Sequence, residues 1–168
     1  PVEFEANAVE EMGNSCDRSF EYAFSTEKIV AVKFNKLKKI SAPRTFIGAF
    51  NKKPINADEV FPLLEDISGE RVFDNLAFEA DQIITFSKVK KITGNTSSIY
   101  SAMFGSLYVQ NTVWNFPSAT EFTGNIWNVA ASYAGEIHFA AANQAAIEAC
   151  EGFDYKWGFP GATIYFDL

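Results

Sequence analysis

The sequence predicts a mainly β repeat solenoid that ends in a strand–helix–strand cap containing one helix. Three observations predict it: a phrase of nine residues that recurs four times, strand-like alternation ahead of that phrase, and a C-terminal segment that breaks the pattern. With 168 residues, 48% of them apolar, the chain is long enough for one domain with a core. We divide it into an acidic leader or N-terminal cap (1–27), a repeat region of about four units (28–135) and a C-terminal capping unit (136–168).

The repeated phrase begins with Phe, has an aliphatic residue or Ala three positions later and Ile or Phe after six, and then Ser or Thr followed by Ala or Gly. Its copies occupy residues 34–42, 61–69, 86–94 and 116–124. A unit of about 25 residues cannot bury its own apolar face, but stacked units share a continuous core. The side chains expected to form two neighbouring buried columns are Phe34, Phe61, Phe86 and Phe116, and Leu37, Leu64, Val89 and Ala119. A β-sandwich is the alternative, although it requires no recurrence of the same residues at the same offsets.

We expect a strand-like run before each of the four copies, and it is clearest in three of them. Large apolar side chains alternate over residues 30–34, 84–86 and 114–116, which is the pattern of a strand with one buried face. Side chains between them would point outward on neighbouring strands. The outward residues that form our candidate binding site are Lys33, Ile83, Thr85, Val113 and Asn115. Ordinary solvated surface is the alternative interpretation of this patch.

The C-terminal segment departs from the repeat. Residues 136–139 predict a strand, the Ala-rich residues 140–151 predict a helix, and residues 162–166 predict a closing strand. Repeat arrays need such a unit to shield the last core face. The side chains expected to close the core are Ile147, some of the helix alanines, Trp157 and Phe159.

Charge is distributed unevenly along the chain. Residues 1–27 carry a net −6, residues 28–53 carry +8 with no acid, and the whole chain carries −7. We expect the two blocks to lie against each other. An anionic partner for the basic block, and a flexible tail over residues 1–15, are the alternatives. The negative net charge and the lack of a run of about 18 apolar residues predict no nucleic-acid partner and no membrane insertion.

Residues suited to catalysis are scarce. The single histidine, His138, excludes a His-pair metal site, and its place in a predicted strand favours a hydrogen-bonded structural role. We expect Cys16 and Cys150 to be free, buried thiols, and the C-terminal end of a helix disfavours a thiolate at Cys150. We therefore predict a protein that is not an enzyme and that binds no metal or cofactor.

Carboxylates offer the remaining catalytic alternative, because a glycosidase needs only two of them. The local clusters are Glu10 with Glu11, Glu65 with Asp66, and Glu79 with Asp81. Each falls in a predicted exposed corner, where solvated charge is the ordinary explanation. A carboxylate-dependent hydrolase is accordingly the least favoured of our hypotheses.

The repeat resembles that of BspA-like leucine-rich-repeat proteins, a surface- and phage-associated family. The unit of that family has a strand ending in Ile-Pro, then x-x-Val-x-x-Ile-Gly, then an Ala-Phe pair. The counterparts here are Phe116-Pro117 with Ala119, Phe122 and Thr123-Gly124, and the Ala-Phe positions are Ala49-Phe50, Ala77-Phe78 and Phe104 after Ala102-Met103. The resemblance covers about residues 28–135, with Phe where Ile is usual and without the family's usual Cys.

The resemblance implies a leucine-rich-repeat-like solenoid that acts as a non-enzymatic binding or adhesion module. Such a module would be extracellular, at a cell surface or on a virion, and would bind a protein or glycan ligand. The alternative is a structural protein of a phage or other assembly that associates with copies of itself or with neighbouring subunits.

Overall fold

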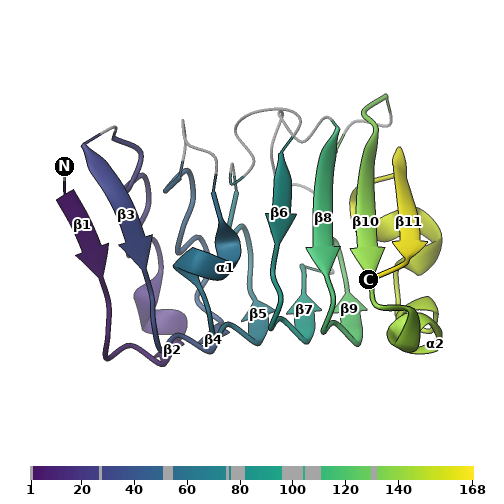
Figure 1. The fold of residues 1–168 in the computed structure, drawn as a ribbon, viewed down its shortest axis with the longest axis horizontal. Helices are drawn as coiled ribbons and strands as arrows, with labels where there is room; N and C mark the ends of the chain where they lie inside the picture. The colour runs from purple at the N-terminus through teal and green to yellow at the C-terminus, as the bar shows by residue number, and fades with distance from the viewer. Residues whose placement is uncertain are drawn as a thin grey trace.

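The computed structural model describes residues 2–26, 28–50, 55–74, 76, 82–95, 104, 111–129 and 132–168. Its strands lie in two rows that run along the long axis of the molecule, with the N-terminus at one end and the C-terminus near the other (Figure 1). The first row comprises β1 (Val2–Glu5), β3 (Ile29–Lys33), β6 (Ile83–Thr85), β8 (Thr112–Phe116), β10 (Gly135–Phe139) and β11 (Ala162–Phe166). The second row comprises β2 (Glu11–Met12), β4 (Lys39–Ile40), β5 (Asp66–Ser68), β7 (Lys91–Thr93) and β9 (Glu121–Thr123).

Within the described residues, the eleven strands form three parallel sheets. Their orders are β1-β3, β11-β10-β8-β6 and β2-β4-β5-β7-β9. The other elements are the short helices α1 (Ala57–Val60) and α2 (Gln144–Glu148) and the 3-10 turns η1 (Asn14–Cys16), η3 (Ala141–Asn143) and η4 (Phe153–Gly158). This is a mixed α/β fold with parallel sheets and few helices. The prediction of a mainly β, leucine-rich-repeat-like solenoid is therefore wrong.

Helix α1 is the physical reason that the first row divides into two sheets. It lies between β3 and β6, in the place where a strand would join them (Figure 1). The side chain of Asn56 caps the helix by accepting a hydrogen bond of 3.2 Å from the Glu59 amide. Asp58 and Glu59 place negative charge in its first turn, which favours the helical N-terminus. Because this segment is helical, no strand there joins β3 to β6, and β6 begins a separate sheet. The expectation of a strand before every copy is therefore wrong at Phe61.

The five-stranded sheet nevertheless follows the offsets of the repeated phrase. Equivalent positions of the four copies are direct neighbours in its ladder, namely Ile40, Ile67, Ile92 and Phe122. All four side chains have 0% exposure. The recurrence in the sequence thus reflects strands that stack in register with one another.

The predicted burial of both columns is confirmed, and the repeated Phe rings stack in two pairs. The repeated Phe side chains and the residues three positions after them are all at most 2% exposed. The ring centroids of Phe34 and Phe61 lie 5.5 Å apart, and those of Phe86 and Phe116 lie 5.8 Å apart. Phe73 links the two pairs, since it lies 5.5 Å from Phe61 and 5.9 Å from Phe86. Phe packing therefore continues past α1 even though the strand ladder does not.

The acidic leader packs against the basic block, as its charge predicts. Arg44 donates two hydrogen bonds to the Asp17 carboxylate, at 3.0 Å and 2.7 Å. These bonds lower the pKa of Asp17 below its usual value. Lys39 Nζ lies 3.4 Å from the carboxylate of Glu11. The leader also contributes β1 and β2, each at the N-terminal end of its sheet.

The C-terminal segment keeps the predicted strands but not the predicted helix length. Residues 136–139 lie in β10 and residues 162–166 are β11, whereas only Gln144–Glu148 form an α-helix, with 3-10 turns on both sides. The side chains of Ile147, Trp157 and Phe159 are fully buried, as predicted. The helix alanines are exposed, so the expectation that some of them face the core is wrong.

Candidate binding face

One face of the four-stranded sheet points away from the core, and its side chains form two rows across the strands. The ladder register places Ile83, Val113, Glu136 and Thr163 in the first row. It places Thr85, Asn115, His138 and Tyr165 in the second row. We call these eight residues the outward face. Ile83 is 68% exposed and Tyr165 is 38% exposed, so the face is accessible at both of its ends.

The residues between these rows point toward the core and support the face from below. Along β8, for example, Trp114 and Phe116 are 0% exposed, whereas Val113 and Asn115 are half-buried. The same alternation occurs along β10. This is the period of two expected for a strand with one buried side.

Four of the five predicted site residues are neighbours on this face. Ile83 is paired with Val113, and Thr85 with Asn115, across β6 and β8. The amide of Asn115 donates a hydrogen bond of 3.1 Å to the Thr85 hydroxyl, which fixes both side chains. The fifth residue, Lys33, is not brought to them. It lies on β3, where its ammonium group is 3.9 Å from the carboxylate of Glu59 on α1.

The face continues onto β10 and β11, which lie outside the repeated phrase. There His138 is held between two carboxylates, with Nδ1 at 2.7 Å from Asp167 and Nε2 at 3.0 Å from Glu136. Its ring also stacks on Tyr165, with 4.7 Å between the ring centroids. These contacts confirm the prediction that His138 is a hydrogen-bonded histidine.

The carboxylates determine the titration of His138. Burial alone would lower its pKa, but the hydrogen bonds to Asp167 and Glu136, together with their charges, outweigh burial and raise the pKa above 6.5. A raised pKa in the folded state means that the charged histidine stabilises the fold fully below its unfolded pKa. That stabilisation is lost as the pH rises through the higher, folded-state pKa.

We therefore expect His138→Gln to lower the melting temperature more at about pH 5.5 than at about pH 9. Thermal unfolding followed by circular dichroism at both pH values measures the difference. A loss that is the same at both values, or larger at the higher pH, would show that the carboxylates do not stabilise the charged ring.

A hollow adjoins the face where β8, β10 and β11 begin. It has a volume of about 210 Å³, and its walls include Asn111, Val113, Glu136 and Thr163. Three of these residues belong to the first row of the outward face. The face therefore combines apolar, amide, hydroxyl and carboxylate groups beside a concave feature.

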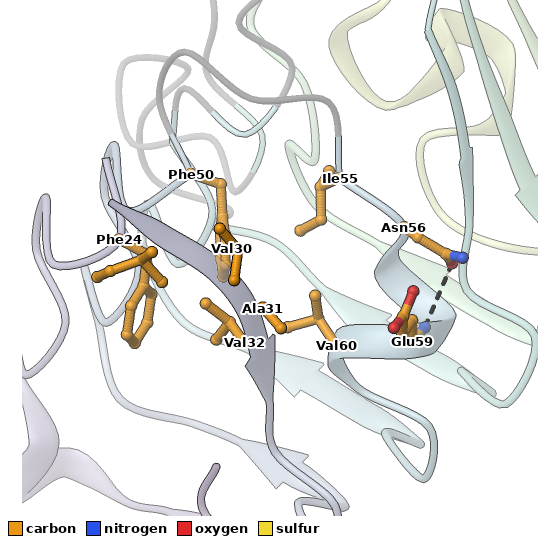
Figure 2. Close-up of a pocket in the computed structure, with 10 residues that line it drawn as sticks. Phe24, Val30, Ala31, Val32, Phe50, Ile55, Asn56, Glu59 and Val60 are labelled. Atoms are coloured by element: carbon orange, nitrogen blue, oxygen red, sulfur yellow. Dashed lines mark hydrogen bonds between the residues drawn. The ribbon is translucent and has the colours of Figure 1, made fainter. Parts of the chain in front are cut away.

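A second hollow, of about 200 Å³, lies near the opposite end of the molecule, between β3 and α1 (Figure 2). Its apolar side chains include Phe24, Val30, Ile55 and Val60. Glu59 and Asn56 supply its polar edge. None of the five predicted site residues lines it.

The part of the face on the last two strands does not follow from the repeated phrase. The predicted site residues all lie in or beside the runs before the repeated Phe, and β10 and β11 fall outside that phrase. The signal was present, because Glu136 and His138 alternate with buried residues in the same way as Val113 and Asn115. Applying the alternation to residues 135–139 and 162–166 would have found them.

The other candidate groups do not join the face. Cys16 and Cys150 are free, as predicted, but they are half-buried rather than buried. The Cys150 sulfur accepts a hydrogen bond of 3.3 Å from the Phe122 amide and donates one of 3.2 Å to the Ala146 carbonyl. The predicted carboxylate pair Glu79 and Asp81 lies outside the described residues, as do Ala77, Phe78, Ala102 and Met103.

Comparison of the chain with models of known protein families, with curated proteins and with solved structures finds no match. In the part of the chain that the structure describes, no helix has the length and apolar character needed to cross a membrane. Over the same residues, no group of three or more His, Cys, Asp or Glu side chains is arranged to hold a metal ion.

Proposed function

We propose that this protein is a non-enzymatic binding module that recognises a protein or glycan on a cell or virion surface through its outward face. The observation that carries the proposal is the pair of side-chain rows across β6, β8, β10 and β11. They present exposed apolar groups beside fixed hydrogen-bonding groups, on a sheet whose other side is buried along β6, β8 and β10. A preorganised surface of this kind loses little conformational entropy when it binds.

The arrangement of the reactive side chains supports a binding role over a catalytic one. Both ring nitrogens of His138 are engaged by carboxylates, while the Cys150 sulfur contacts the Phe122 amide and the Ala146 carbonyl. A cysteine nucleophile would need a histidine within hydrogen-bond reach. Neither residue has the other among these partners.

A structural role in a phage or other assembly is the second candidate function. It is favoured by the position of β1 and β11, each of which ends its sheet. An end strand offers backbone groups to a neighbouring subunit. The two functions differ in their ligand: the binding module recognises a foreign surface, and the assembly protein recognises its neighbours.

A screen of the chain against arrays of glycans and extracellular matrix proteins tests the proposed function. We expect Ile83→Asp to weaken binding of the selected ligand at least about tenfold, because it places a charge at an apolar contact of the face. Leu63→Asp is the matched control, since Leu63 is also exposed, at 41%, but lies outside the face. Equal affinities of the two variants, with both folded, would exclude the outward face as the binding surface.

A further inference from the structure

The far edge of β11 offers backbone hydrogen-bonding groups. In a strand, successive residues turn their N–H and C=O groups to opposite sides. The Asp167 amide donates to the Phe139 carbonyl at 3.2 Å, so Asp167, Tyr165 and Thr163 turn theirs toward β10. The Ala162 amide donates away from β10, to the Phe159 carbonyl at 3.0 Å. Ile164 and Phe166 lie two and four residues after Ala162, so their N–H and C=O groups also point away from β10, to the open edge.

Only the beginning of this edge is covered within the described residues. At Ala162 the amide is satisfied by Phe159, and the carbonyl accepts a hydrogen bond from Lys156 Nζ. No described residue caps Ile164 or Phe166 in the same way. Two N–H groups and two C=O groups are thus presented along the edge of a parallel sheet, an arrangement that favours pairing with another strand.

The side chains of β11 are also incompletely covered. In the core row that ends at Ile164, the neighbours Ile137 and Trp114 have 0% exposure. In the row that ends at Phe166, Phe139 and Phe116 have 0% exposure. Ile164 and Phe166 themselves are only half-buried. Both apolar rows therefore end at a strand with space for one more layer.

We propose that a second copy of this chain supplies that layer, with the two β11 strands paired antiparallel across a two-fold axis at Tyr165. In this register Ile164 faces Phe166 of the second copy, and Phe166 faces its Ile164. Each of these pairs exchanges two hydrogen bonds, so all four free groups of each edge are used. The proposal is independent of the ligand of the outward face.

Charge favours this pairing over a head-to-tail arrangement. Across the two-fold axis Tyr165 lies beside Tyr165 and Thr163 lies opposite Asp167, so no carboxylate faces another. Pairing β11 with β1 of the next copy would instead bring Glu3 and Glu5 alongside the strand edge that ends in Asp167. Like charges on adjacent strands are destabilising, and a head-to-tail contact would also build an open polymer. The two-fold dimer joins two outward faces into one continuous sheet.

Light scattering coupled to size exclusion, at about 100 µM of the chain, tests the proposal. We expect a dimer for the wild type. Tyr165→Lys should raise the dimer dissociation constant at least about tenfold, because it places two ammonium groups opposite each other at the axis. Thr163→Lys, on the same strand and the same face, should leave the dimer intact because its partner is Asp167. Circular dichroism confirms that both variants are folded.

Cysteine cross-linking tests the register in which the two β11 strands pair. In a Cys16→Ser, Cys150→Ser background, Tyr165→Cys should form a disulfide-linked dimer on mild oxidation, since residues in a non-hydrogen-bonded antiparallel pair lie about 4.5 Å apart. Thr163→Cys should not cross-link, because it faces Asp167. A monomer at this concentration, a dimer in which both cysteines cross-link equally, or polymers that grow with concentration would each overturn the proposal.

Discussion

Replacing Phe86 by alanine should lower the free energy of unfolding by about 3–5 kcal/mol. Phe86 is 1% exposed and lies in the middle of the packed Phe residues. Its ring is nearly parallel to that of Phe116, at 3°, and lies 5.9 Å from Phe73 and 6.1 Å from Phe104. These neighbours belong to different stacked segments, so they cannot all move to fill the cavity that alanine would leave.

Equilibrium denaturation by urea measures this loss. Leu63→Ala is the control, because Leu63 is 41% exposed and should contribute less than about 1 kcal/mol. Equal effects of the two substitutions would mean that Phe86 is not part of the core column.

Replacing Gly158 by alanine should cost about 2–4 kcal/mol. Gly158 has a φ of +93°, and a Cβ atom built there would lie 1.9 Å from the carbonyl oxygen of Trp127. The same segment is bonded to its neighbour through the backbone: the amides of Ile126 and Trp127 donate to the Trp157 carbonyl, and the Val129 amide donates to the Gly158 carbonyl. An alanine would separate these backbones and loosen η4 from the core.

Gly13→Ala is the matched control for this substitution, because no heavy atom lies within 4 Å of the corresponding Cβ position. Differential scanning calorimetry measures the melting temperatures of both variants and of the wild type. If Gly158→Ala melts with the wild type, the close approach of η4 to residues 126–129 does not exist in solution.

The periodic part of the fold could be predicted from the sequence because a repeated environment selects the same residue type. Phe34, Phe61, Phe86 and Phe116 occupy equivalent buried positions, and the strand residues six positions later pair directly. The offsets between copies therefore predict which residues pair in the five-stranded sheet. They do not show whether a strand precedes each copy.

The division of the first row into two sheets depends on a local signal in one copy. Asn56, Asp58 and Glu59 favour a helical turn before Phe61, and a pattern shared by four copies cannot reveal a feature of one. This turn also accounts for Lys33, which pairs with Glu59 on α1 instead of joining the other predicted site residues.

The candidate site could be predicted only as far as the repeat extended. Thr85 and Asn115 were placed correctly as neighbours because both precede a repeated Phe by one residue. Glu136, His138 and Tyr165 complete the face from strands that lie outside the phrase. Their proximity results from β10 and β11 adding in register to β8, a tertiary feature that no spacing in the sequence states.

We propose that ligand binds at the outward face and not in the hollow between β3 and α1. Methyl-detected NMR distinguishes the two surfaces when the chain is titrated with the ligand found in the array screen. The methyl groups of Ile83 and Val113 report on the face. Those of Val30 and Ile55 report on the hollow shown in Figure 2. We expect the methyl resonances of Ile83 and Val113 to shift with ligand concentration while those of Val30 and Ile55 remain in place. Shifts at Val30 and Ile55 with none at Ile83 and Val113 would show that the ligand binds in the hollow and not on the outward face.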